Sequence, residues 1–193
     1  MSHHPQITHP VAARPPVTRA YGLRNLYAAR FVFAALWAGV FALSASALTP
    51  VSVTLLVLYP VFDVAAAVAD LRAPGEDRSR IALRVNVGLS ASSAVALGIA
   101  ASSGMADVLR VWGAWAVVAG LVQVVVATRR GRLEGQRVQA LSGAISVVAG
   151  TAFVAMAAGP DVSLAGLAGY GALGGIFFLI SAVRLHRGMV TPS

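Results

Sequence analysis

The run VSVTLLVLYPVFDVAAAVAD, residues 51–70, decides the fold of this chain. It is apolar over about 20 residues, the length that an α-helix needs to cross the hydrocarbon core of a bilayer. Hydrocarbon offers no partner for an open strand edge, so the run predicts a transmembrane helix. Pro60 has no N–H to donate to the carbonyl of Leu56, which predicts a helix kink there. Asp63 is an ionisable group at membrane depth, which is costly enough to indicate a functional site.

Five further apolar runs of similar length lie along the chain. Together the runs predict six transmembrane helices, at residues 28–48, 51–70, 81–102, 109–128, 138–158 and 163–184. Of the 193 residues, 58% are hydrophobic and 11% are charged. A soluble domain has roughly a quarter of its residues charged, so this composition favours the bilayer. The sequence therefore predicts an all-α, polytopic membrane protein.

The polar ends of the chain set the expected domain boundaries. Residues 1–27 hold four of the nine prolines and have no apolar run of the kind found in a signal peptide. They predict a disordered cytoplasmic N-terminal tail. The six-helix transmembrane domain is expected over residues 28–188, and a short C-terminal tail over residues 189–193.

The arginines predict the orientation of the helices. The chain has fifteen arginines and no lysine, and fourteen arginines lie beside the termini or beside the second-to-third and fourth-to-fifth connections. The positive-inside rule then places both termini in the cytoplasm. Trp112 and Trp115 are expected near the outer interface, where amphipathic rings prefer to lie. A net charge of +8 could also suggest nucleic-acid binding, but no basic-aromatic cluster supports that function.

Stretches of the sequence resemble one another and predict three repeated helical hairpins. GAWAVVAGLVQVVVATRRG, residues 113–131, aligns with GALGGIFFLISAVRLHRG, residues 171–188. The third and fifth spans align through VNVGLSASS, residues 85–93, and ALSGAISVV, residues 140–148. Each unit buries little by itself, so we expect the copies to stack into a bundle.

Small residues at four-residue spacing predict the faces on which the helices contact one another. They allow close backbone approach, which is how helices associate in lipid. The spacing fits both packing within one chain, which we expect, and a homo-oligomer formed through the same faces. These residues are Ala116, Gly120, Ser142, Ser146, Gly150, Gly171 and Gly175.

The run 111–188 resembles the HdeD-like short-repeat membrane proteins. The resemblance lies in the Gly-rich segments VWGAWAVVAGLVQ (111–123), LSGAISVVAG (141–150) and YGALGGIFFLISA (170–182), and in the Arg-rich turns. It covers roughly residues 28–188 and implies three two-helix units in a bacterial inner membrane. It also implies a link to acid or envelope stress, and it implies no catalytic residues.

Patterns typical of membrane enzymes are missing from the sequence, so we expect neither an enzyme nor a cofactor. A rhomboid-type protease needs a histidine on one span, and no predicted span contains a histidine. A CDP-alcohol phosphotransferase needs closely spaced aspartates, whereas Asp63 and Asp70 are seven residues apart with no acid between them. The chain has no cysteine, and the spans lack the ligands of a His/Glu metal site.

Polar residues inside the predicted spans form a candidate intramembrane site, made of Asp63, Arg84, Asn86 and Gln123. Asp63 lies about 10 Å deep by helical rise, and we expect it to face the bundle interior, because exposure to lipid is costly. Arg84, near the start of the neighbouring third span, is its expected counter-charge. Arg30 on the first span is the alternative.

Two functions remain open for this site. In a non-catalytic integral membrane protein, the pair of opposite charges would only fix the helix register. In a small transporter or channel for protons, ions or a small solute, a polar track would run through Asp63, Asn86 and Gln123. A polar cavity that reaches both faces favours transport, and a closed apolar bundle favours the structural role. The partner expected in either case is the lipid bilayer.

Overall fold

The computed structural model describes residues 16–72, 77–129 and 136–190, and every element in these ranges is an α-helix. All six of these helices are long and apolar enough to cross a membrane. The prediction of an all-α, polytopic membrane protein with six transmembrane helices is therefore confirmed. The helices are α1 (Pro16–Ser44), α2 (Pro50–Arg72), α3 (Asp77–Ala100), α4 (Met105–Arg129), α5 (Gln136–Met156) and α6 (Ala165–Val190).

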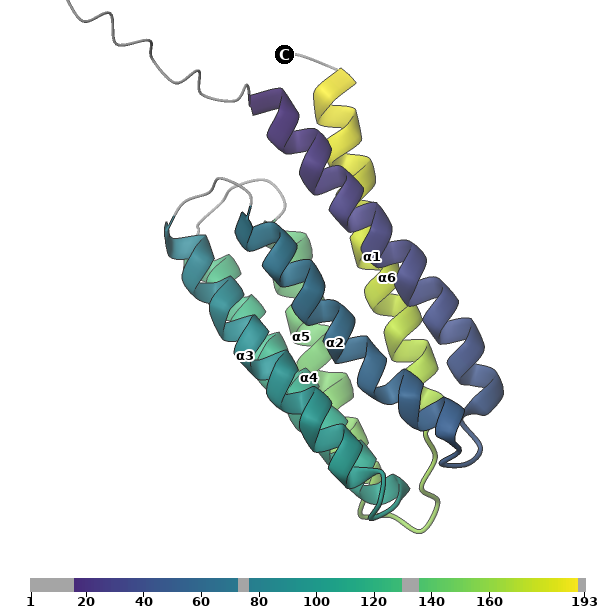
Figure 1. Ribbon diagram of the computed structural model, residues 1–193. Helices are drawn as coiled ribbons and strands as arrows, with labels where there is room; N and C mark the ends of the chain where they lie inside the picture. The colour runs from purple at the N-terminus through teal and green to yellow at the C-terminus, as the bar shows by residue number, and fades with distance from the viewer. Residues whose placement is uncertain (1–15, 73–76, 130–135, 191–193) are drawn as a thin grey trace, which may run out of the picture.

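The helices run up and down, side by side, in one bundle (Figure 1). The start of α1 and the end of α6 lie together at one end, which we call the terminal end. The turns that join α1 to α2, α3 to α4 and α5 to α6 lie at the opposite end, which we call the turn end. The predicted topology, with both termini on one side, matches this arrangement of the helices.

Local sequence explains how the turn into α2 is built. Pro50 is the first residue of α2, where a missing N–H costs nothing. The Thr49 backbone N–H donates to Ser52 Oγ at 2.8 Å, and the Ser52 N–H donates to Thr49 Oγ1 at 3.2 Å. These reciprocal bonds are a capping box, which satisfies backbone donors that the helix itself leaves unpaired.

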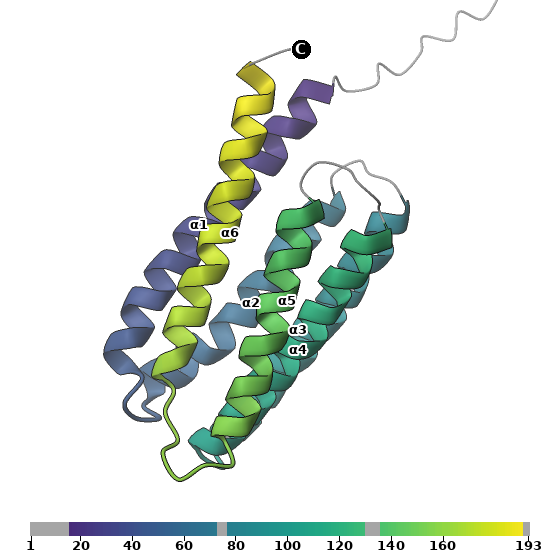
Figure 2. The same cartoon turned by 180° about the vertical axis from the view of Figure 1, so that it is seen from behind.

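Three helix pairs make the most extensive contacts: α4 with α5, α1 with α6, and α2 with α3. Figure 2 shows α1 beside α6 and, across the bundle, α4 near α5. The turn-linked pairs, α1–α2, α3–α4 and α5–α6, pack less extensively, so we call their interfaces the three seams. Among the described residues, backbone contacts join each helix only to its two neighbours, which makes a closed ring.

The predicted hairpin repeat pairs the helices that share a seam, whereas the extensive contacts join helices of different hairpins. The repeat itself therefore stays a prediction. For the α4–α5 and α1–α6 pairs, the physical reason for the different pairing lies in their small residues. A Cβ placed on Gly113 would lie 2.5 Å from the carbonyl oxygen of Gly150, and one placed on Gly120 would lie 2.5 Å from that of Gly143. Only glycine allows α4 and α5 to approach so closely.

The Gly171 and Gly175 pair of α6 is used within the chain in the same way. A Cβ on Gly175 would lie 3.1 Å from the Ala34 side chain, and one on Gly171 would lie 2.7 Å from the Trp37 ring. This GxxxG face is therefore an intramolecular contact with α1. A homo-oligomer through the remaining small-residue faces stays a prediction.

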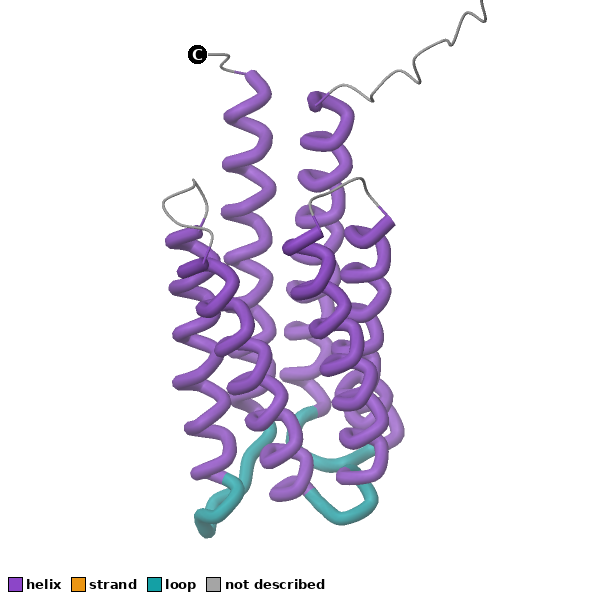
Figure 3. The backbone as a smooth tube through the Cα atoms, turned by 90° about the vertical axis from the view of Figure 1, so that its left-hand side faces the viewer, coloured by secondary structure: helices purple, strands orange, loops and turns teal. Residues whose placement is uncertain are grey.

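The predicted disordered tail over residues 1–27 is wrong for residues 16–27, which are the first turns of α1. Residues 1–15 lie outside the described residues. Both α1 and α6 rise beyond the other helices at the terminal end (Figure 3), and Arg24 Nη1 of α1 lies 3.5 Å from His186 Nδ1 of α6. The Tyr27 and Phe178 rings stack with centroids 6.2 Å apart. Likewise α6 runs to Val190, into the predicted C-terminal tail.

Large aromatic side chains fill the centre of the ring in the half nearest the turn end. The Trp37 and Trp112 rings stack with centroids 5.6 Å apart, and Trp112 meets Trp115 edge-on at 5.3 Å. Trp112 is 0% exposed and Trp115 is 7% exposed, so both rings pack inside the bundle, and their depth near the outer interface stays a prediction. The centre of a six-helix ring is too wide for backbone contact, and wide side chains fill it instead.

Candidate functional site

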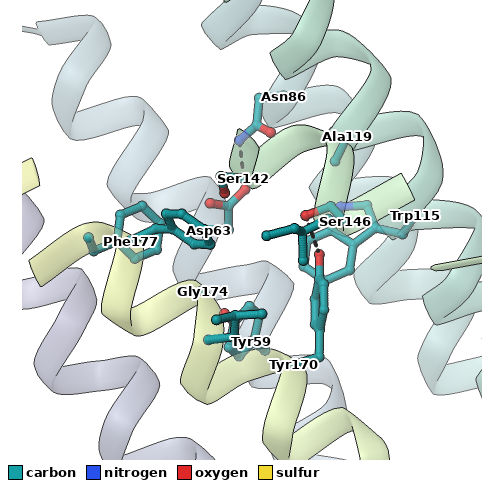
Figure 4. A pocket seen from close by; sticks show the side chains of 13 residues that line it. Tyr59, Asp63, Asn86, Trp115, Ala119, Ser142, Ser146, Tyr170, Gly174 and Phe177 are labelled. Carbon is teal, nitrogen blue, oxygen red and sulfur yellow. Dashed lines mark hydrogen bonds between the residues drawn. The ribbon is translucent and has the colours of Figure 1, made fainter. Parts of the chain in front are cut away.

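Asp63 on α2 faces the bundle interior, and both of its carboxylate oxygens have partners. Arg30 Nη2, from α1, lies 3.4 Å from Oδ1. The Asn86 side-chain amide donates to Oδ2 at 2.6 Å (Figure 4), and Ser90 Oγ donates to the same oxygen at 2.8 Å. The side chains of Arg30 and Asp63 are 14% and 21% exposed. Asp63 is thus a mostly buried carboxylate held by one cation and two neutral donors.

Helical spacing explains why α3 supplies two of these donors. Asn86 and Ser90 are four residues apart, so they lie one turn apart on the same helix face. Tyr59 and Asp63 have the same spacing on α2 and face the same part of the bundle. The tight α2–α3 pair therefore carries a continuous strip of polar and aromatic groups toward the centre of the ring.

Arg30 is held in place by the α6 side chain Phe178 as well as by Asp63. The guanidinium carbon lies 5.0 Å from the centroid of the Phe178 ring, a cation–π contact between the helices of the α1–α6 pair. The Arg30 Nε atom is buried and has no hydrogen-bond partner among the described residues. The distance of 3.4 Å between Arg30 Nη2 and Asp63 Oδ1 is longer than that of a strong charge-assisted hydrogen bond, about 2.7–2.9 Å.

Each of the three seams is crossed by a polar contact near the centre of the bundle. Arg30 and Asp63 cross the α1–α2 seam. The Trp115 indole donates to Ser90 Oγ at 3.3 Å across the α3–α4 seam. The Tyr170 hydroxyl donates to Ser146 Oγ at 3.1 Å across the α5–α6 seam (Figure 4). All six described helices therefore contribute to the polar groups around Asp63.

A cavity of ≈ 100 Å³ lies beside these groups, inside the ring. Its walls combine one carboxylate, hydroxyl and amide groups, and the faces or edges of aromatic rings (Figure 4). A second cavity of ≈ 20 Å³ lies on the Arg30 side of Asp63. The lining of the larger cavity is Tyr59, Asp63, Asn86, Trp115, Ala119, Ser142, Ile145, Ser146, Tyr170, Leu173, Gly174, Phe177 and Phe178.

The structure brings together two of the four predicted site residues, Asp63 and Asn86. The expected pair of Asp63 with Arg84 is wrong: the partner is Arg30, the alternative, and the Arg84 side chain is exposed. Arg84 precedes Asn86 by two residues, which turns it about 200° around α3 at 3.6 residues per turn. It forms no ion pair with Asp63 within the described part of the chain.

Gln123 lies apart from this site, in the tight α4–α5 interface. Its Cβ is 3.0 Å from where a Cβ on Gly143 would lie, and it does not line the cavity. Its Oε1 is buried without a hydrogen-bond partner among the described residues. The polar track predicted through Asp63, Asn86 and Gln123 is therefore wrong at Gln123. Pro60 is buried in α2, which continues through it as a helix, and the kink there stays a prediction.

Several residues of the site were not singled out from the sequence. Ser90 was one of many serines, and Tyr59 and Tyr170 looked like ordinary residues of apolar spans. Ser146 was singled out only as a small residue of a helix contact face. The four-residue spacing of Asn86 and Ser90 was the available signal for a shared face. The contacts across the seams depend on the order of helices around the ring, which the sequence pattern does not specify.

Comparison with known proteins gives no relative from which a role could be taken. No protein-family model, no curated protein and no solved structure matches the chain. The resemblance to the HdeD-like proteins therefore stays a prediction, and the functional argument depends on the site itself.

Proposed function

We propose that this protein is a small integral membrane transporter whose solute site is the cavity beside Asp63. The observation that carries this proposal is a mostly buried carboxylate next to a ≈ 100 Å³ cavity, surrounded by polar groups from all six described helices. A charge pair that only fixed the helix register would need no cavity. Ionisable groups inside a helical bundle are typical of solute and ion pathways.

The packing supports access to the cavity from the terminal half of the bundle. The largest fully buried side chains, which include Phe41, Leu56, Leu97, Leu109 and Leu164, all lie in the half nearest the turn end. They seal the cavity on that side. Asp63 is nevertheless 21% exposed, so we infer that water reaches it from the other half. A site closed on one side fits one state of a transporter better than it fits an open channel.

The three seams are where we expect the tight helix pairs to move against one another when the transporter changes state. The α4–α5 and α1–α6 pairs have close glycine contacts, and such pairs move as units more easily than they come apart, because close packing is lost when they separate. The three tight pairs meet along loosely packed seams, and the contacts that bridge the seams surround the cavity. A solute that competes for these contacts would therefore change how the pairs sit against one another.

We also propose that the terminal end faces the cytoplasm of a bacterium, with the helices in its inner membrane. The distribution of the arginines supports this orientation, since by sequence thirteen of the fifteen lie nearer the terminal end, Arg30 lies midway along α1, and Arg110 lies near the turn end. In this orientation the cavity is loaded from the cytoplasm. The link to acid or envelope stress implied by the resemblance stays a prediction.

The proposed function is not catalytic and requires no cofactor. The lining of the cavity supports this, because its polar groups are one carboxylate, one amide, hydroxyls and an indole. Among the described residues, no three His, Cys, Asp or Glu side chains come together as metal ligands would.

Electrical recording from proteoliposomes on a solid-supported membrane tests this function. We expect transient currents after a jump in pH, in sodium or in an ammonium salt, and we expect Asp63→Asn to abolish them. Arg84→Gln is the matched control, because it removes an exposed arginine outside the cavity and should leave the currents unchanged. Folded wild-type protein that gives no current under any of the three jumps would contradict transport.

A further inference from the structure

The chemistry of the larger cavity indicates which class of solute it would hold. The lining has a single charged group, the carboxylate of Asp63, and none of the described residues that line it is cationic. Aromatic rings form much of the remaining wall, from Tyr59, Trp115, Tyr170 and Phe177. The faces of such rings carry negative charge density, so a ring that turns its face to the cavity adds to the attraction of the Asp63 carboxylate for a cation.

The size of the cavity and its few charged ligands favour an organic cation over a metal ion. One water needs about 10–15 Å³ of space on this measure, so ≈ 100 Å³ accommodates a solute of several heavy atoms. Divalent metals are held by several oxygen ligands, and carboxylates supply most of their charge. An alkylammonium needs one counter-charge and an apolar wall that accepts its methyl groups.

The position of Arg30 adds a second feature to this site. Arg30 lines the smaller cavity and not the larger one, and Asp63 lines both. The Arg30 guanidinium rests on the Phe178 ring and lies 3.4 Å from Asp63, without a short hydrogen bond. A second cation at the same carboxylate would repel Arg30, so the two compete for Asp63.

We propose that the cavity binds a small alkylammonium ion, with Asp63 as its anchor and Arg30 as a tethered counter-cation that the solute displaces. This proposal rests on the proposed function, because it names the solute class of the same site. When the site is empty of solute, Arg30 neutralises Asp63. When a solute cation takes the carboxylate, Arg30 loses its partner, and the Arg30–Asp63 contact across the α1–α2 seam is weakened.

Binding of tetramethylammonium to the purified full-length protein in nanodiscs tests this proposal. The Trp115 ring lines the cavity, so intrinsic tryptophan fluorescence reports occupancy, and calorimetry gives the affinity. We expect saturable binding by the wild-type protein, no comparable response to sodium chloride at equal ionic strength, and much weaker binding of tert-butanol, a neutral molecule of similar size. An equal response to either control would overturn the proposal.

The variants separate the roles of the two charged residues. Arg30→Gln removes the competitor, so tetramethylammonium should bind at least about ten-fold more tightly, as expected for one like charge nearby. Arg84→Gln should leave the affinity unchanged. Asp63→Asn should abolish binding. Phe177→Leu should weaken it a few-fold by removing one aromatic face, and this variant keeps the test valid if Asp63→Asn does not fold.

Opposite results would overturn the proposal. Weaker binding by Arg30→Gln would mean that Arg30 holds the ligand and does not compete with it. Folded wild-type protein without saturable binding would exclude an alkylammonium site, even if a pH or sodium jump gives Asp63-dependent currents. Binding without any current would leave the alkylammonium site in place and contradict transport, so the two failures are distinguishable.

Discussion

The guanidinium of Arg30 on α1 lies 3.4 Å from the carboxylate of Asp63 on α2. These two helices belong to different tight pairs and share one of the three loosely packed seams. A charged contact therefore links parts of the bundle that backbone packing joins only weakly. This makes the pair both a determinant of stability and the point at which a solute can act on the fold.

The Arg30–Asp63 pair is expected to show a measurable coupling energy. Asp63→Asn leaves a mostly buried arginine without its counter-charge, and we expect it to lower the free energy of unfolding by about 1–3 kcal/mol. The double variant with Arg30→Gln should lose less than the sum of the two single variants. Unfolding of the four proteins in mixed micelles gives the coupling as a double-mutant cycle. Strict additivity would show that the pair contributes no stability, and Arg84→Gln is the control that should change little.

The glycines of the α4–α5 interface are expected to be intolerant of any side chain. Gly120→Ala places a Cβ 2.5 Å from the Gly143 carbonyl oxygen, so the helices must separate. We expect a loss of about 1–3 kcal/mol, as for overpacked cores. Gly88→Ala on α3 is the control, since a Cβ there has no neighbour within 4 Å. A melting temperature for Gly88→Ala that is equal to or below that of Gly120→Ala would contradict the close packing of α4 and α5.

The two central tryptophans provide a matched test of one hydrogen bond. The Trp37 indole donates to the Leu55 carbonyl at 2.7 Å, whereas the Trp112 indole N–H has no partner among the described residues. Both rings are buried, so replacement by phenylalanine removes the same atoms from each. Trp37→Phe should cost about 1 kcal/mol more than Trp112→Phe, the net value of a typical hydrogen bond. Equal losses of unfolding free energy would show that the Trp37–Leu55 hydrogen bond contributes no net stability.

The proposed orientation is testable because the native chain has no cysteine. We expect Asp161→Cys, in the turn between α5 and α6, to react with a membrane-impermeant reagent only from outside the cell. His186→Cys, near the end of α6, should react only from the cytoplasmic side. If Asp161→Cys reacts only from the cytoplasmic side and His186→Cys only from outside, the topology is the reverse of the proposed one. The sealed side of the cavity would then face the cytoplasm.

The sequence was sufficient to predict the helices, because their length and composition are local properties. Six apolar runs gave six helices, and the unusual position of Asp63 identified the centre of the site. The start of α1 was placed too late, since the polar residues 16–27 gave no signal of packing against α6. Contacts between the two ends of a chain are not visible in local hydropathy.

The partner of Asp63 could not be selected from the sequence for a related reason. Arg84 is nearer in the chain and lies on the helix that packs tightly against α2, which favoured it. The direction of its side chain on α3 excludes it, and α1, the other neighbour of α2, brings Arg30 into reach. A pattern of charges gives the candidates, and the direction of each side chain on its helix decides between them.

The central claim is that water and small solutes reach the cavity beside Asp63 from the terminal half of the bundle, and labelling of Ser142→Cys in native membranes tests it most directly. Ser142 lines the cavity, whereas Val148 on the same helix is 71% exposed on the apolar outer surface, so Val148→Cys is the control. A small impermeant thiol reagent applied from the terminal side should modify Ser142→Cys and leave Val148→Cys unmodified. If Ser142→Cys is as unreactive as Val148→Cys, while both react fully after unfolding, the cavity is closed to solutes and the account is contradicted.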